Sequence, residues 1–334
     1  MVPPTEQSET PSSTTLHEES KRTTLEHAVA NEERLLAPTL PQLRFVFLAI
    51  GVSLGLFLSM LDASIVATSL FTIAVEFEDV AGINWVALAY TLTYLGCAVL
   101  FARLSDVLGR RAAFAAAYVV FVAFSLACGF ARNMAQLIAF RAVQGIGGSG
   151  LYSVSMIILP ELTPDHQKKY IAAIVAVVLA AAGVLGPVLG GILTQYTSWR
   201  WVFWINGPVG LVSIVIFLAT WPNEKYLPAI ELISWKEVDF VGALLLIAAA
   251  VLIVFPFQNT SSSQEWSSAV FIGPLVAGVI SLLALFAWQA FIDRQLARRK
   301  KKYFTAAALP LALLRSRAYA SAVLRTSLDT FRNL

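Results

Sequence analysis

Two ionisable residues fall inside long apolar stretches and not at their ends. Asp62 follows one apolar run, and Arg141 lies in the first half of another. A charge at the middle of a bilayer costs roughly 2.5–3.5 kcal/mol on insertion scales, so such residues usually serve a proton or ion pathway. The alternative is that each charge pairs within a helix bundle only to hold it together. We expect Asp62 and Arg141 to take part in proton coupling.

Each of these charges shares one side of its predicted helix with other polar or small residues. We expect both stripes to face a polar interior. Without a second helix bundle to cover them they would face lipid, and we then expect low abundance or self-association. The stripes consist of Ser59, Asp62 and Ser69, and of Arg141, Gln144, Gly148 and Tyr152.

The segment Ala102–Arg111 predicts a tight hairpin between two helices. Gly109 permits a turn conformation that other residues rarely adopt. Asp106 precedes Arg110 by four residues, which is the spacing of a helical ion pair. Anchoring of a helix end by basic residues explains Arg110 and Arg111, but it leaves Asp106 and Gly109 unexplained.

Two of the apolar stretches are rich in glycine. Small residues at helical spacing let helices approach closely in membranes, and a proline inside a helix removes one hydrogen bond. Packing is a sufficient interpretation of either run taken alone. The runs are Gly145–Gly150, and Gly183, Gly186, Pro187, Gly190 and Gly191.

The composition is that of a membrane protein. Hydrophobic residues make up 57% of the 334 residues and charged residues 13%, whereas a soluble domain carries about 25% charged residues. A net charge of +3, with basic residues at the ends of apolar stretches, argues against a nucleic-acid partner. Cys97 and Cys128 lie in apolar runs and indicate no disulfide framework. We find no nucleophile–base pair, phosphate loop or metal-ligand cluster outside the apolar stretches, so we expect no enzyme activity, cofactor or metal.

Eight stretches are long enough to cross a bilayer, which takes about 20 helical residues. Lipid offers the backbone no partners, so each must be a helix, and the fold class is all-α integral membrane. The predicted spans are 45–68, 85–104, 112–131, 135–159, 171–194, 202–221, 241–257 and 270–292.

The Lys and Arg residues of the short connections predict the topology. They are concentrated in the connections after spans two, four, six and eight, and basic loops stay in the cytoplasm. We therefore expect a cytoplasmic N-terminus. Residues 1–42 predict a disordered cytoplasmic tail, 222–240 a cytoplasmic linker, and 293–334 a basic cytoplasmic segment with the incomplete start of a further span.

In their order along the chain, these motifs resemble the major facilitator superfamily. The resemblance rests on Asp62, the Asp106 hairpin, the run after Arg141, the Gly-Pro run and the stretch Ser198–Pro208. It extends over residues 44–314 and is most specific for the 14-span drug:proton antiporters of fungal type. It implies that residues 43–221 form the N-terminal six-helix bundle and that residues 241–292 form two additional spans.

The resemblance also implies roles for single residues. Arg141 matches the arginine that is linked to proton coupling in the family, and Asp62 matches the span-one acid of the 14-span group. The hairpin residues match the motif that latches the two halves during alternating access, although Ala102 replaces its usual glycine. The Gly-Pro run matches the antiporter motif that seals the bundle interface. The hairpin set is Asp106, Gly109, Arg110 and Arg111, and the antiporter set is Gly183, Gly186, Pro187, Gly190 and Gly191.

A 14-span carrier has a second six-helix bundle, and we expect this chain to lack it. Three interpretations stay open: a truncated efflux carrier, a non-transporting half-protein that acts through another membrane protein, and a half-carrier that transports as a homodimer. The resemblance implies antiport with protons across the plasma membrane, or alternatively the vacuolar membrane.

Aromatic and polar side chains within the spans are candidates for a substrate cavity. They suit a small hydrophobic or cationic molecule, although for each aromatic residue ordinary packing is the simpler explanation. The candidates are Tyr90, Tyr94, Gln144, Tyr152 and Trp201.

Overall fold

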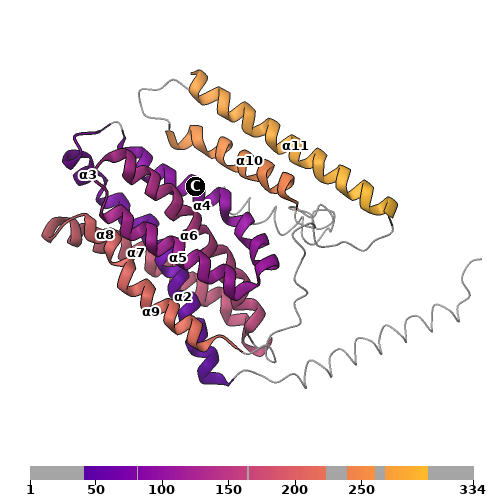
Figure 1. Ribbon diagram of the computed structural model, residues 1–334, viewed down its shortest axis with the longest axis horizontal. Coiled ribbons are helices and arrows are strands. Elements are labelled where there is room, and N and C mark those ends of the chain that lie inside the picture. Colours follow the sequence, from indigo (N-terminus) through magenta and orange to yellow (C-terminus); the bar gives the residue numbers. More distant parts are fainter. Residues whose placement is uncertain (1–40, 81, 164, 223–238, 260–267, 300–334) are drawn as a thin grey trace, which may run out of the picture. The chain divides into compact units, whose positions relative to one another are not determined.

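The computed structural model describes residues 41–80, 82–163, 165–222, 239–259 and 268–299, and this part of the chain is all-α (Figure 1). All of its helices belong to one compact unit. The helices are α2 (Gln42–Ile65), η1 (Val66–Thr68), α3 (Leu70–Glu76), α4 (Ile83–Leu108), α5 (Arg110–Gly129), α6 (Met134–Leu162), η2 (Asp165–Tyr170), α7 (Ile171–Tyr196), α8 (Arg200–Trp204), α9 (Asn206–Thr220), α10 (Phe240–Asn259) and α11 (Ala269–Arg299).

The eight predicted spans are confirmed. Eight stretches of helix in the described residues are long and apolar enough to cross a membrane, and no predicted end differs from the observed one by more than four residues. Helix α11 continues past the last of these spans to Arg299, so the first residues of the segment 293–334 are helical. Most of residues 1–42, 222–240 and 293–334 lies outside the described residues.

Span six is made of two helices that meet at Ile205. Helix α8 ends at Trp204 and α9 begins at Asn206. Pro208 lies in the first turn of α9, where its missing N–H costs no helical hydrogen bond. The break places the side chain of Asn206 at the start of a new helix, inside the bundle, where it is 1% exposed.

Helix α6 lies between α4 and α5 because its glycine run lets both backbones approach. A Cβ atom added at Gly145 would lie 2.5 Å from the carbonyl oxygen of Tyr90, and one at Gly147 would lie 2.5 Å from the amide nitrogen of Phe121. Side chains rarely tolerate such distances to backbone atoms. The prediction that this run permits close helix contact is therefore confirmed.

The Gly-Pro run of α7 contacts α2 with only part of its glycines. Gly186 and Gly190 are buried, and Ala182 precedes them at the same spacing of four residues. A Cβ atom at Gly190 would lie 2.5 Å from the carbonyl oxygen of Ile65. Gly183 and Gly191, by contrast, have open space around them. The stripe that packs on α2 thus includes Ala182, which the sequence analysis missed, and excludes Gly183 and Gly191.

Arg44 closes the bundle by joining its first helix to its last. At the start of α2, its guanidinium donates to the carbonyl oxygens of Thr220 at 3.1 Å and Trp221 at 2.7 Å, at the end of α9. Arg44→Met is expected to lower the free energy of unfolding by about 1–2 kcal/mol, because both carbonyls lose a charged donor. Tryptophan fluorescence during denaturation of the purified protein measures this. The free energy of unfolding of Arg44→Lys should lie between the values of wild type and Arg44→Met. A wild-type value for Arg44→Met would contradict the expectation.

The two additional spans form a helical hairpin (Figure 1). Its helix α10 packs on α4 of the bundle. Gly96 of α4 accommodates Ile247 and Val251, and the rings of Trp85 and Phe255 lie 5.6 Å apart. Asp239 holds α10 and α11 together. This hairpin therefore rests on α4, the helix that also supplies Tyr90 to the bundle interior.

Asp239 joins the beginning of α10 to the later part of α11. Its carboxylate accepts the backbone N–H of Gly242 at 2.7 Å, the indole N–H of Trp288 at 2.9 Å and the side-chain amide of Gln289 at 2.9 Å. One carboxylate thus caps α10 and holds α11 beside it.

Candidate functional site

Asp62 and Arg141 form an ion pair at the centre of the six-helix bundle. The Nη1 of Arg141 donates to Oδ2 of Asp62, and the two side chains are 1% and 0% exposed. Arg141 also donates from Nε to the carbonyl oxygen of Val86 at 3.2 Å. Its guanidinium carbon lies 4.1 Å from the centre of the Tyr90 ring, a cation–π contact. The cation is therefore held by α2, α4 and the ring face of a tyrosine.

Two amides complete the surroundings of Asp62. Its Oδ1 accepts Nε2 of Gln144 at 2.8 Å and Nδ2 of Asn206 at 3.0 Å. Gln144 is also bonded to the cation, because its Oε1 accepts Nη1 of Arg141 at 2.9 Å. Asn206 donates in addition to Ser125 at 2.9 Å. The pair is thus enclosed in a hydrogen-bonded network that joins α2, α5, α6 and α9.

This enclosure corrects one expectation. We expected the stripes around Asp62 and Arg141 to face lipid unless a second bundle covered them. Both charges are instead buried among helices of this chain, as are Ser59, Ser69 and Gln144. The physical reason is that the two stripes face each other across α2 and α6, and each supplies the partner that the other needs.

Asn206 is a member of the site that the sequence analysis did not single out. It lies in the Ser198–Pro208 stretch, whose resemblance to the family does not by itself indicate a chemical role for this amide. An amide within an apolar span was the available signal, because such a group needs a buried partner. The sequence alone could not show that Asn206 lies next to Asp62, because 144 residues separate the two along the chain.

Three of the four predicted aromatic residues form a continuous row that begins at Arg141. The rings of Tyr90 and Tyr94 lie 5.6 Å apart, and those of Tyr94 and Tyr152 lie 5.9 Å apart. Trp201 is not part of this row. It lies on α8, is 48% exposed and packs edge-on against Trp204.

The hairpin between α4 and α5 has the predicted ion pair and a further partner. Gly109 has a φ of 86°, the left-handed region that glycine enters most easily. Arg110 donates from Nη1 to Asp106 at 2.5 Å, and it forms a two-pronged contact with Glu161 at 2.9 Å and 3.1 Å. Glu161, at the end of α6, was missed by the sequence analysis. Arg111 is exposed.

Helices α2 and α7 enclose an apolar groove of about 600 Å³ that opens to the surface. Among its lining residues only Ser53 and Gln167 are polar, and the others include Phe45, Phe57 and Ile174. Its volume lies within the range of about 300–1,000 Å³ that is typical of small-molecule sites.

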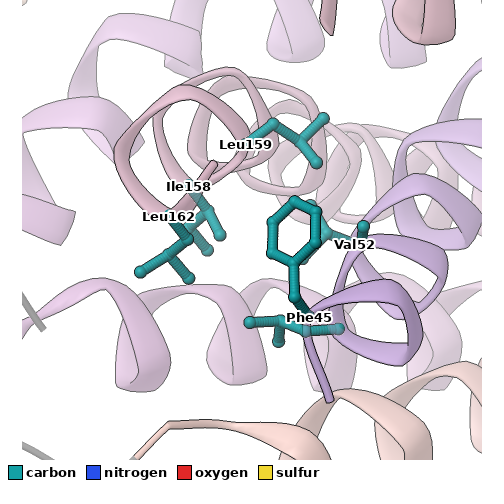
Figure 2. A pocket seen from close by; sticks show the side chains of 7 residues that line it. Phe45, Val52, Ile158, Leu159 and Leu162 are labelled. Carbon is teal, nitrogen blue, oxygen red and sulfur yellow. The ribbon is translucent and has the colours of Figure 1, made fainter. Parts of the chain in front are cut away.

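The second cavity lies between α2 and α6, where Phe45 and Val52 face Ile158, Leu159 and Leu162 (Figure 2). It has a volume of about 10 Å³. A single water molecule needs about 10–15 Å³ by the same measure, together with polar partners. This apolar space is therefore a packing gap and is too small for a substrate.

Comparisons with known proteins agree with the motifs. The model of the Major Facilitator Superfamily matches residues 52–321. The chain is 33% identical over 253 residues to the MFS-type transporter FPY5 of Fusarium mangiferae, a match that covers 73% of this chain and 42% of that protein. It is 35% identical over 251 residues to the efflux pump FUS6 of Gibberella fujikuroi, over 74% of this chain and 44% of that protein.

A bacterial relative gives a similar match. Multidrug resistance protein 3 of Bacillus subtilis is 31% identical over 240 residues, which are 72% of this chain and 46% of that protein. The chain thus spans less than half the length of each of these three relatives.

Proposed function

This chain belongs to the major facilitator superfamily, and we propose that it forms the proton-coupled half of an efflux carrier for hydrophobic or cationic small molecules. It is an integral membrane protein with eight described spans. The observation that carries the proposal is the enclosed pair of Asp62 and Arg141. A carboxylate and a guanidinium that are both shielded from solvent interact strongly, so the gain of one proton by the carboxylate changes the electrostatics of this site more than it would at the surface.

The coupling follows from the partners of Asp62. While the carboxylate is charged, it holds Arg141 and thereby joins α2 to α6. A proton on Asp62 removes the charge that attracts the guanidinium, and the link between the two helices weakens. A carrier that binds a proton on one face of the membrane and releases it on the other can drive the movement of its halves in this way.

Efflux, as opposed to uptake, is supported by the names of two relatives, an efflux pump and a multidrug resistance protein. The basic ends of the spans support an orientation with the α4–α5 hairpin and the N-terminus in the cytoplasm. Glu161 and Arg110 would then latch the cytoplasmic ends of α4, α5 and α6.

In this proposal the substrate binds beside two features of the bundle, the groove of α2 and α7 and the row of tyrosines. The groove of α2 and α7 offers an apolar wall, and the partly exposed rings of Tyr94 and Tyr152, which continue the row beyond the buried Tyr90, offer faces that bind cations. In a carrier of the relatives' length, a second bundle would cover α2 and α7 and close the substrate site between the halves.

Association with a second copy is the alternative that the structure favours next. Helix α7 exposes Val177, Val184, Val188 and Ile192. Because Asp62 and Arg141 are already enclosed within the bundle, a second copy would bind through this apolar face and not through the charges. A homodimeric half-carrier could use this apolar face. A non-transporting half-protein could use it to bind another membrane protein.

The test compares three proteins in a yeast strain without its own drug pumps. They are this chain, a fusion of this chain to the second half of a relative such as FUS6, and the fusion with Asp62→Asn. At equal abundance we expect only the unmodified fusion to expel a fluorescent cationic dye, and a protonophore should abolish that efflux. Efflux that survives Asp62→Asn would remove Asp62 from the mechanism. Efflux by the chain alone would support the homodimer.

A further inference from the structure

In the part of the chain that the structure describes, every hydrogen-bond partner of the Asp62 carboxylate is a donor. Its three partners are Nη1 of Arg141, Nε2 of Gln144 and Nδ2 of Asn206. This arrangement suits a charged carboxylate, which only accepts. A protonated Asp62 carries a hydroxyl that must donate, and each of these three neighbours presents another donor to it. A neutral Asp62 therefore needs an acceptor that the network does not offer as it stands.

The other titratable groups packed around Asp62 are already engaged. From α4, the hydroxyl of Tyr90 donates to the carbonyl oxygen of Ser59 at 2.9 Å. From α5, the thiol of Cys128 contacts Oε1 of Gln144 at 3.5 Å. From α6 comes Arg141 itself, and α9 contributes the uncharged Asn206. Among the groups that are hydrogen-bonded to Asp62 itself, the amides of Gln144 and Asn206 are the two that carry an oxygen which a turn of the side chain could present to the new proton.

Asn206 is fixed in its present orientation. Its Nδ2 donates to Asp62 and also to Oγ of Ser125 at 2.9 Å, and the Ser125 hydroxyl donates to the carbonyl oxygen of Phe203 at 2.9 Å. If the amide turned, its oxygen would face a hydroxyl whose proton is already used. A turn of the Asn206 amide would therefore disturb two hydrogen bonds at once, that of Asn206 with Ser125 and that of Ser125 with Phe203.

Gln144 is placed differently, because its two ends touch the two charges. Nε2 donates to Asp62, and Oε1 accepts from Arg141 at 2.9 Å and from Cys128. Half a turn about the last side-chain bond exchanges oxygen and nitrogen. The oxygen then accepts the proton of neutral Asp62, and the nitrogen faces Arg141, which is also a donor.

We propose, on the basis of the proton coupling proposed above, that Gln144 turns its amide when Asp62 gains a proton and so releases Arg141. A hydronium ion transfers one proton to the carboxylate: one O–H bond of the hydronium ion breaks, one O–H bond forms on Asp62, and a water molecule is left. Arg141 loses its contact with the Asp62 charge and with the Gln144 oxygen in one step. It keeps the carbonyl of Val86 and the face of Tyr90. Gln144 is thus a positioning residue that makes release of the arginine depend on the proton.

The thiol of Cys128 reports the orientation of this amide without any added label. Its S–H vibration absorbs where few other protein groups do, and its frequency rises when the hydrogen bond from the thiol weakens. In the present orientation the thiol meets an oxygen, and after the turn it meets an NH2 group. Cys97 is the other cysteine of the chain, and Cys97→Ala in every sample leaves one S–H band.

The experiment records infrared difference spectra of the 334-residue chain in lipid vesicles as the pH is lowered. We expect a carboxylic-acid C=O band to appear together with a rise of the S–H frequency. Asp62→Asn should show neither change. Gln144→Met, which has no amide, should show the raised S–H frequency at every pH.

Three results would overturn the proposal. In the first, the C=O band appears while the S–H band stays in place. In the second, the S–H shift persists in Asp62→Asn. In the third, neither band changes over the pH range in which circular dichroism shows intact helices. If Gln144→Met does not fold, the comparison of wild type with Asp62→Asn decides the question alone. None of these spectra depends on transport, so failure of the efflux assay and failure of this proposal are separate results.

Discussion

Loss of either member of the Asp62–Arg141 pair is expected to destabilise the protein by about 3–5 kcal/mol, because the remaining charge stays buried without its partner. Asp62→Leu leaves a guanidinium that is 1% exposed, and Arg141→Leu leaves a carboxylate that is 0% exposed. The double variant removes both charges and replaces them with apolar volume. We expect it to recover most of the lost free energy of unfolding, since apolar replacements of buried ion pairs are often neutral or stabilising.

The measurement is denaturant unfolding of the purified chain in lipid–detergent micelles, followed by the fluorescence of its eight tryptophans. The four proteins form a double-mutant cycle, which isolates the interaction between the two side chains. A double variant as unstable as the less stable single variant would contradict the prediction. It would mean that packing around the network, and not the charge, carries the energy.

The same four proteins separate structure from mechanism when they are joined to the second half of a relative. The recovered double variant should reach the membrane in normal amounts and still fail to drive efflux with a proton gradient, because it has no titratable carboxylate at the centre of the bundle. Normal proton-driven efflux by the double variant would show that the pair serves stability alone. That outcome would favour the simpler interpretation that the charges hold the bundle together.

The features that could be predicted from the sequence are those encoded over short distances. Hydropathy over about 20 residues defines each span, and the confirmed pair of Asp106 and Arg110 needs only helical spacing. Gly109 could be assigned to a turn because few other residues adopt its backbone conformation. In each case the residues that determine the feature lie within a few turns of one another.

The partners across the bundle could not be predicted, because the sequence does not state which helix faces meet. Asp62 is separated from Arg141 by 79 residues, and Arg110 from Glu161 by 51. Two charges in apolar spans suggested function for each residue singly, and their pairing required the packing of α2 on α6. For the same reason the sequence could not show which glycines of the Gly-Pro run pack on α2, since these glycines look equivalent in the sequence.

The difference between the packed and the open glycines of the Gly-Pro run leads to the second prediction with a large expected effect. The open glycines of the same motif serve as its control. Leucine at Gly186 or Gly190 is expected to cost more than about 3 kcal/mol, the upper end for ordinary overpacking, because the new side chain meets α2. A Cβ atom at Gly186 would already lie 2.7 Å from Cβ of Ser64. Ser64 also donates to the carbonyl oxygen of Ala182 at 3.0 Å, and separation of the helices would break this bond.

Leucine at Gly183 or Gly191 should leave the unfolding free energy of this chain within about 1 kcal/mol of wild type, since each position has open space around it. Helix propensity would even favour the change. In the fusion with a second bundle, however, these two variants should lose efflux, because the proposed interface brings the other half against α7. Unfolding measurements on the chain and dye efflux by the fusion test the two halves of this expectation. Normal efflux by Gly183→Leu and Gly191→Leu would mean that the open glycines face lipid, and the interface would then have to be sought along α2.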